Sequence, residues 1–244
     1  MREQEITYDL YLFGNSFDQN GNLKPSVCPD LTQQVVERHL QKFDMGTNDL
    51  LKNNLGWVLI GYTAVFDEPI KSCIPLVGRT WHSGKKGPYY RRETAFYDEN
   101  GKRLMGVSTF SVMLDMNTRS IARHYALPGG LCDCTDLSVP DAKPFAAAAD
   151  TYAPIETFTV RNSQVDALGH LNNARYADFA FDVMTDDERA KTLRRLEITF
   201  YNELRRGDSF LLSKSPHPES GCLYFRGENN EGKKAFDIAF FFES

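Results

Sequence analysis

The chain has 244 residues, of which 41% are hydrophobic and 25% charged, and its formal net charge is -5 at pH 7. This composition is typical of a globular protein with a sizeable core, built as one large domain or two small fused ones. The negative charge argues against nucleic acid as a partner. No apolar run approaches the roughly 20 residues of a membrane-spanning helix, so no membrane span is expected.

Cysteine usage favours a reducing compartment. The five cysteines are odd in number and scattered along the chain, a pattern typical of cytoplasmic proteins. Residues 1–5 are too polar and acidic for a secretory signal. Cys132 and Cys134 lack the second Cys/His pair that a zinc site needs. We therefore expect a cytoplasmic protein without a metal or redox cofactor.

The start of the chain predicts a strand over 6–13 and then an amphipathic helix over 31–44, because apolar residues recur there at helical spacing. Asp30 is the expected N-cap, with Gln33 completing a capping box. Gly46 is the expected C-terminal cap, and Thr47 starts a further short turn.

Four β-rich segments joined by tight connections follow this helix and predict an antiparallel sheet. They are 57–66, 76–82, 89–97 and 104–114. Residues 126–154 then break the pattern with proline, glycine and alanine tracts, as a linker does, with room for a short helix in its tail.

After this linker the same order returns, so each half reads β-α-β-β-β-β. The expected elements are a strand at 155–160, a helix at 173–184 and strands at 196–201, 209–214, 222–225 and 235–242. We expect an N-terminal unit over 1–125, the linker over 126–154 and a C-terminal unit over 155–244.

Two six-residue segments support an internal duplication. Residues 18–23 and 166–171 share Asp, Gly and Leu at matching positions between the first strand and the helix of each half, and His170 stands where the first copy has Asn22. A long helix wrapped by an antiparallel sheet is the hotdog arrangement. The predicted fold is therefore α+β, a tandem or double hotdog, in which pairing two units covers an open sheet edge.

The segment 165–176 carries the candidate chemistry, at a strand-to-helix junction. Asp166 is a candidate nucleophile or general base, and His170 a group that orients it, polarises a carbonyl or moves a proton. Backbone N–H groups from Gly169 to Asn172 are candidate oxyanion donors, with Gly169 allowing close approach of substrate. On these residues alone, Asp166 is more commonly a turn residue and a lone histidine more commonly structural. Asn172 and Asn173 suit helix capping in either interpretation.

Several blocks of the sequence resemble the acyl-ACP thioesterases of plants and bacteria, which are double hotdogs. Residues 166–176 are similar to the family's Asp-x-Asn-x-His-x-Asn-Asn block, and Glu203 falls where the family has its catalytic glutamate. The first half carries similar blocks at 56–59, 79–84 and 113–119. The resemblance implies a thiolester hydrolase of fatty acid biosynthesis that acts on fatty acyl-ACP. It also implies Asp166, His170 and Glu203 as catalytic residues and no cofactor.

One departure keeps two alternatives open. Leu168 stands where the family has asparagine, and the local sequence is similar to single-hotdog acyl-CoA thioesterases. Acyl-CoA is therefore the alternative substrate to acyl-ACP, and a catalytically silent protein that binds acyl thioesters is the alternative from another class. Chain-length preference and oligomeric state, including a homodimer, stay open.

Two further hypotheses concern the substrate. Trp57, with Tyr62, Phe66, Val36 and Leu40, is a candidate wall of an acyl-chain tunnel, although apolar residues at such spacings are more commonly core. Two basic clusters are candidates for steering the acidic carrier protein, although a solvated charge run is the commoner case. They are Lys85, Lys86, Arg91 and Arg92, and Arg189, Lys191, Arg194 and Arg195.

Overall fold

The structure, a computed structural model, describes residues 6–123, 125–128, 134–215 and 221–243. Short 3-10 turns lie at Gly14–Ser16, Gln41–Phe43, Asn162–Gln164 and Asn173–Arg175. The helices and strands, in chain order, are β1 (Thr7–Tyr11), α1 (Val27–Leu40), α2 (Thr47–Lys52), β2 (Leu55–Phe66), β3 (Pro75–Lys86), β4 (Tyr89–Tyr97), β5 (Arg103–Asp115), β6 (Ser120–Ile121), β7 (Ala153–Thr159), α3 (Tyr176–Asp182), α4 (Asp186–Arg189), β8 (Leu193–Phe200), β9 (Ser209–Lys214), β10 (Cys222–Asn229) and β11 (Lys234–Phe242).

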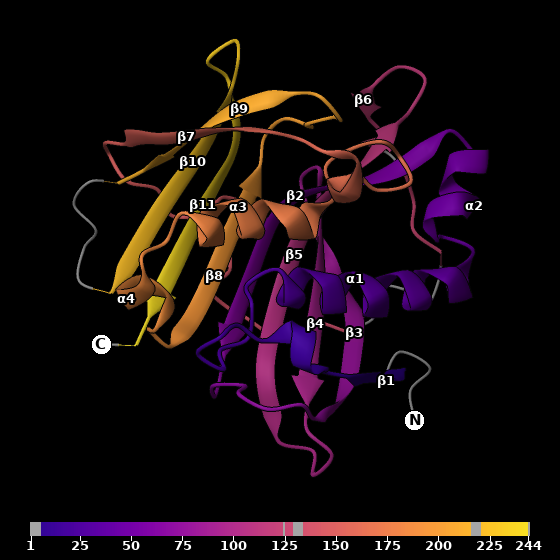
Figure 1. Cartoon of the computed structure of the whole chain (residues 1–244). Coiled ribbons are helices and arrows are strands. Elements are labelled where there is room, and N and C mark those ends of the chain that lie inside the picture. The colour runs from indigo at the N-terminus through magenta and orange to yellow at the C-terminus, as the bar shows by residue number, and fades with distance from the viewer. Residues whose placement is uncertain (1–5, 124, 129–133, 216–220, 244) are drawn as a thin grey trace.

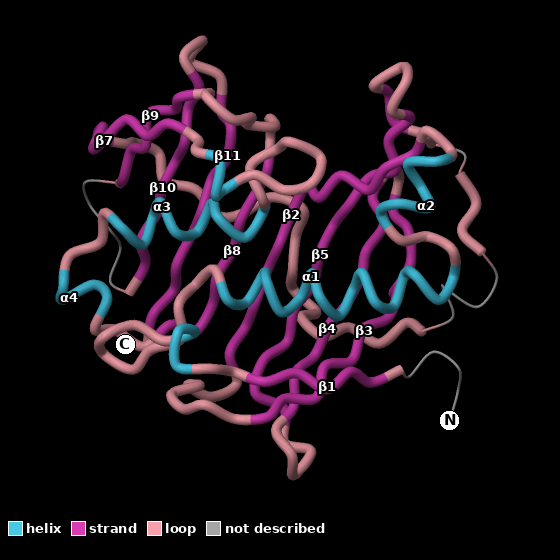
Figure 2. The backbone as a smooth tube through the Cα atoms, turned by 45° about the vertical axis from the view of Figure 1, so that its right-hand side comes forward, coloured by secondary structure: helices cyan, strands magenta, loops and turns pink. Residues whose placement is uncertain are grey.

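The strands form one continuous sheet that repeats its own order. The order is β1-β3-β4-β5-β2-β8-β11-β10-β9-β7, with β6 paired to β5. The two halves meet where β2 and β8 pair antiparallel, with Gly61 opposite Thr199 and Val65 opposite Arg195. Helices α1 and α3 lie along the same side of the sheet (Figures 1 and 2). This arrangement confirms the predicted α+β double hotdog.

The predicted strands are confirmed, but two helix caps are wrong. Helix α1 begins at Val27, so Asp30 lies inside its first turn and forms an ion pair with Arg175. Pro29 is tolerated in this turn because the first N–H groups of a helix have no intrahelical partner. Asp44, with φ 54°, takes the left-handed conformation that ends the following turn, and Gly46 instead caps the start of α2.

The second half differs from the sequence expectation in two further places. The predicted helix over 173–184 is divided into the 3-10 turn Asn173–Arg175 and α3, which ends at Asp182. The part of the linker that the structure describes contains no helix. Its backbone groups bond to the sheet instead.

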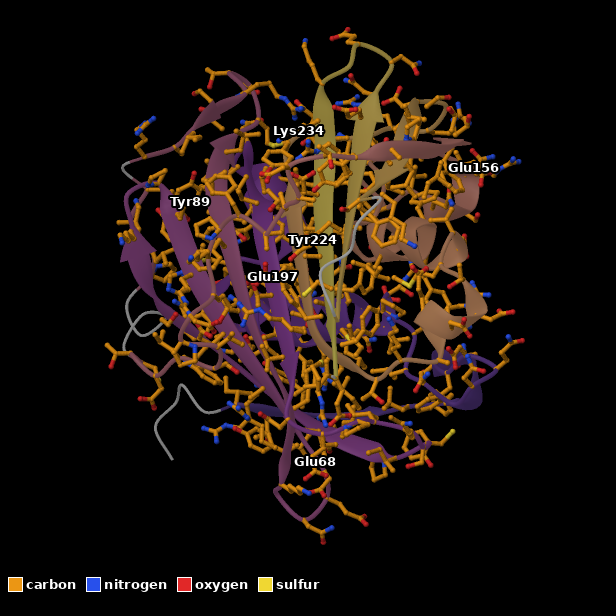
Figure 3. The ribbon with its side chains drawn as sticks, turned by 90° about the vertical axis from the view of Figure 1, so that its left-hand side faces the viewer. Glu68, Tyr89, Glu156, Glu197, Tyr224 and Lys234 are labelled. Atoms are coloured by element: carbon orange, nitrogen blue, oxygen red, sulfur yellow. The ribbon has the colours of Figure 1, made fainter. Side chains whose placement is uncertain are left out.

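The linker crosses the face of the sheet that α1 and α3 leave open. The backbone N–H of Ser138 donates to Oε2 of Glu93 on β4 (2.9 Å), and that of Ala147 donates to Oε2 of Glu197 on β8 (2.8 Å). Figure 3 shows Tyr89 and Glu197 on the strands, away from the helices drawn at its right. Because β4 and β8 belong to different halves, the linker fastens the two halves together.

This close crossing leads to a stability prediction at Gly61 on β2. A Cβ added there would lie 2.2 Å from the carbonyl oxygen of Pro144, a backbone atom that cannot rotate away. We expect Gly61→Ala to lower the free energy of unfolding by about 1–3 kcal/mol, as measured by denaturant titration. Gly14→Ala is the control, because no atom lies within 4 Å of its added Cβ. Equal stability of the two variants would contradict the close contact.

Candidate active site

The Asp166 side chain organises a tight loop between β7 and α3. Its Oδ1 accepts the backbone N–H of Leu168 (2.9 Å) and of His170 (3.2 Å). Gly169 makes the turn possible, because its φ of 77° is costly for a residue with a Cβ. The loop thereby holds the Asp166 carboxylate in one orientation. Because Oδ1 accepts both loop N–H groups, Oδ2 is the oxygen that can contact a bound substrate or water.

The matching loop of the first half has the same geometry. Oδ1 of Asp18 accepts the backbone N–H of Asn20 (2.8 Å) and of Asn22 (2.9 Å), and Gly21 has a φ of 73°. The structure thus confirms the duplication. The Asn22 side chain donates to the carbonyl of Arg189 (3.0 Å), a contact with the other half. Only the second copy places a histidine in this loop.

A short antiparallel contact brings Glu203 to His170. His170 bridges to Arg205, and the N–H of Leu171 donates to the carbonyl of Leu204 (2.7 Å). As a result, Nε2 of His170 lies 3.3 Å from Oε2 of Glu203. When Nε2 carries the proton, it donates to this carboxylate, which fixes the ring and its tautomer.

Arg119 reaches the same carboxylate from the other half of the chain. It follows β5, has a φ of 54°, and its Nη2 lies 2.6 Å from Oε2 of Glu203. Glu203 thus lies between a histidine and a guanidinium. The site is built from both halves.

A cavity of about 170 Å³ lies at this junction, and Asp166, His170 and Glu203 all line it. We call it the junction cavity. Its walls also include Trp57 from β2 and Tyr176 from α3. Burial raises the pKa of the Tyr176 hydroxyl, and the nearby charges of Glu203 and Asp166 add to the effect. This hydroxyl therefore stays protonated. The three predicted catalytic residues therefore share one cavity.

A larger cavity of about 470 Å³ lies between α1 and the sheet of the first half. We call it the helix cavity. It adjoins the junction cavity, because Trp57, Leu59, Asp166, Leu168 and Asn173 line both. Its volume is typical of a small-molecule site, whereas the junction cavity suits only a reacting group.

The structure separates the predicted tunnel residues. The helix cavity is lined by Trp57, Tyr62, Val36 and Leu40, whereas Phe66 belongs to the hydrophobic core and is not among the lining residues. Tunnel and core residues have the same periodicity in sequence. Only packing distinguishes them.

Two predicted substrate-binding residues have other contacts. Gly169 lines neither cavity. Asn172 lines the helix cavity, but its Oδ1 caps the turn by accepting from the N–H of Ala174 (2.9 Å) and contacts Gln33 on α1. Asn173 lines both cavities, whereas Asn172 lines only the helix cavity.

The predicted oxyanion donors are wrong. The N–H groups of residues 169–172 all donate within the protein: Gly169 to Asp166 O, His170 to Asp166 Oδ1, Leu171 to Leu204 O and Asn172 to Gln164 O. These four N–H groups are therefore already bonded and are not available to a developing negative charge. Sequence reasoning did not place Asn173 at the cavities or Arg119 at Glu203, and the only available signal was that each stands in a block similar to the thioesterase family.

Several arginines of the two predicted basic clusters are engaged within the protein. Neighbouring strand residues point to opposite faces, so Arg91 pairs with Glu93 on the linker face while Arg92 is buried beneath α1. In the second cluster, Arg189, Arg194 and Arg195 form ion pairs with Asp186, Glu243 and Glu197.

No three His, Cys, Asp or Glu side chains gather to hold a metal ion within the described residues. Cys134 is a free thiol, and Cys132, like residues 1–5, lies outside the described part. Within that part, no helix is long and apolar enough to cross a membrane.

Comparisons with known proteins agree along almost the whole chain. The family models for the N-terminal and C-terminal domains of acyl-ACP thioesterases match residues 7–125 and 147–242. No curated protein shows significant sequence similarity to the chain.

Three solved structures share the fold at low sequence identity. An acyl-ACP thioesterase from Bacteroides thetaiotaomicron is 23% identical with a TM-score of 0.87 and covers 98% of each chain. The 12:0-ACP thioesterase from Umbellularia californica is 14% identical with a TM-score of 0.85 and covers 100% of this chain and 98% of its own. A putative oleoyl thioesterase from Lactobacillus plantarum is 17% identical with a TM-score of 0.79 and covers 99% and 98%.

Proposed function

Because the chain belongs to the acyl-ACP thioesterase family, we propose that it hydrolyses fatty acyl-ACP to free fatty acid and ACP at the junction cavity. One observation carries the assignment of the site. Asp166, His170 and Glu203 line a cavity that shares lining residues with a second cavity large enough for an acyl chain.

The chemistry follows from these positions. Water attacks the thioester carbonyl carbon, the C–S bond breaks, and the proton lost by water returns to the carrier's thiolate. In one route, Oδ2 of Asp166 takes that proton as a general base. In the other, Oδ2 first attacks the carbonyl carbon and expels the thiolate, and water then hydrolyses the acyl–Asp166 anhydride, which releases the fatty acid and restores the carboxylate. Both routes need the charged carboxylate. His170, oriented by Glu203, moves the proton, and the Asn173 amide is the proposed donor to the thioester oxygen as it gains charge.

The carrier is the point at which the alternative function differs. Leu168 lines both cavities at the position where the family has asparagine, and the sequence around it is similar to single-hotdog acyl-CoA thioesterases, so it is the feature of the site that favours the acyl-CoA alternative. A silent acyl-thioester-binding protein is disfavoured, because Asp166, His170 and Glu203 meet in one cavity.

A hydrolysis panel tests the function. Purified protein is given acyl-ACP and acyl-CoA of the same chain lengths, and free thiol is measured. We expect a higher kcat/KM for acyl-ACP. Preference for acyl-CoA would support the alternative carrier, and turnover of neither, with binding retained, would support the silent protein and overturn the proposal.

Three broader assignments belong to the same proposal. The chain is proposed to be cytoplasmic, as the scattered cysteines suggest, and to act in fatty acid biosynthesis, as its family suggests. Its proposed units are 1–125 and 155–244, joined by the linker 126–154; the family models match 7–125 and 147–242, so the C-terminal match begins within that linker. A homodimer is proposed through the exposed outer strand β7, and light scattering in solution tests it.

A further inference from the structure

A pair of side-chain amides joins α1 to the loop that carries the candidate chemistry. Nε2 of Gln33 donates to Oδ1 of Asn172 (3.3 Å), and Nδ2 of Asn172 donates to Oε1 of Gln33 (3.4 Å). Oδ1 of Asn172 also accepts the backbone N–H of Ala174 (2.9 Å). Because a backbone N–H can only donate, it fixes the orientation of the Asn172 amide and therefore that of Gln33. The pair ties a helix of the first half to a turn of the second half.

Helix α1 holds the other end of this turn as well. Asn172 caps the short turn that begins at Asn173, and Arg175 in the same turn forms an ion pair with Asp30 on α1. Asp30 and Gln33 are three positions apart, so they lie on the same face of the helix. Asn173, the proposed donor to the thioester oxygen, lies between the two contacts. The position of α1 therefore sets the position of Asn173.

The amide pair is also part of the wall of the helix cavity, because Gln33 and Asn172 both line it. Two other polar residues of α1 on this wall bond elsewhere. Thr32 donates to a carbonyl within α1, and Glu37 accepts the first N–H of α2. Whatever fills the helix cavity thus touches the link between α1 and the loop directly.

We propose that Gln33 is a positioning residue through which the acyl chain promotes its own hydrolysis. A chain that fills the helix cavity packs against the Gln33–Asn172 pair, excludes water from it and restrains the turn that presents Asn173. The inference rests on the proposed function, because it takes the chain to lie in the helix cavity and the thioester in the junction cavity. A hydrogen bond away from water is electrostatically stronger. Binding energy from the remote chain is thereby used to orient the reacting groups, which raises kcat more than affinity.

The kinetic test compares a long and a short substrate in Gln33→Leu, which removes both hydrogen bonds of the amide pair and keeps a side chain of similar size. We expect kcat on dodecanoyl-ACP to fall by about 10-fold with little change in KM. On butanoyl-ACP we expect little change, because the short chain leaves the helix cavity unfilled in both proteins. Steady-state hydrolysis, followed by release of free thiol, gives kcat and KM for each substrate.

Gln34→Leu is the matched control. It makes the same substitution at the next residue of α1, which is exposed and lines neither cavity, so both substrates should keep their wild-type kinetics. Gln33→Glu is the conservative variant. It can still accept from Nδ2 of Asn172 but has no donor for Oδ1, so we expect it to keep part of the rate on dodecanoyl-ACP.

A second measurement needs no turnover. S-dodecyl and S-methyl pantetheine are non-hydrolysable thioethers that do and do not fill the helix cavity. We expect S-dodecyl pantetheine to slow amide hydrogen exchange over residues 172–176 in the wild type, and S-methyl pantetheine to leave it unchanged. In Gln33→Leu, we expect S-dodecyl pantetheine to bind with near wild-type affinity, measured by calorimetry, without slowing this exchange.

An unchanged kcat in Gln33→Leu would overturn the proposal. So would an equal loss on both substrates, because that result assigns Gln33 a structural role only, and so would slowed exchange in the Gln33→Leu complex. If Gln33→Leu does not fold, the same criteria apply to Gln33→Glu. Failure of the wild type to hydrolyse any acyl thioester, with the exchange difference intact, would instead count against the proposed function.

Discussion

Asp166→Asn is expected to lower kcat by about 100-fold or more while leaving the loop folded. Asparagine keeps an Oδ1 that accepts the N–H groups of Leu168 and His170, so the turn that this atom organises survives. The variant loses the negative charge and the basic second oxygen, which both chemical routes require. Steady-state hydrolysis of acyl-ACP by the purified variant measures the effect.

Asp18→Asn is the matched control, because the duplication provides the same loop without the chemistry. Asp18 makes the same two hydrogen bonds through Oδ1, but its loop carries Asn22 in place of a histidine. We expect its kcat to match the wild type, and its melting temperature to change about as much as that of Asp166→Asn. Near-normal hydrolysis by Asp166→Asn would show that Asp166, like Asp18, is only a turn residue.

Glu203→Gln and Glu203→Ala should each lower kcat by about 100-fold or more, because Glu203 fixes the ring of His170 across 3.3 Å. Glutamine keeps the shape but presents a neutral amide to both His170 and Arg119. The pair of variants therefore separates loss of charge from loss of packing. The measurement is kcat on acyl-ACP, with circular dichroism to confirm the fold.

Glu243→Gln is the control for this prediction, because it breaks a surface pair with Arg194 and should leave kcat unchanged. Wild-type rates in both Glu203 variants would show that Glu203 does not belong to the site.

Arg119 is a positioning residue, so Arg119→Met should lower kcat by about 10-fold with little change in KM, and Arg119→Lys should recover part of the loss.

The periodicity of the sequence determined most of the fold. Alternation in strands and recurrence at helical spacing are local properties, so the β-α-β-β-β-β order was predicted for both halves. The repeated Asp-x-x-Gly-x-Leu segment predicted the duplication, since identical turn chemistry gives Asp18 and Asp166 the same hydrogen bonds. The predicted helix caps were less accurate. Asp30 has the chemistry of an N-cap, but its partner is Arg175, a residue 145 positions away.

Only the tertiary structure decided which groups meet. Sequence spacing gave no reason to place Arg119 at Glu203, because their contact depends on the pairing of β2 with β8 and of Leu171 with Leu204. It also could not reveal that the N–H groups of residues 169–172 are already bonded, or that Arg91 and Arg92 face opposite sides of the sheet. These contacts depend on register, burial and long-range pairing, whereas the Asp166 loop depends on six consecutive residues and could be predicted from the sequence alone.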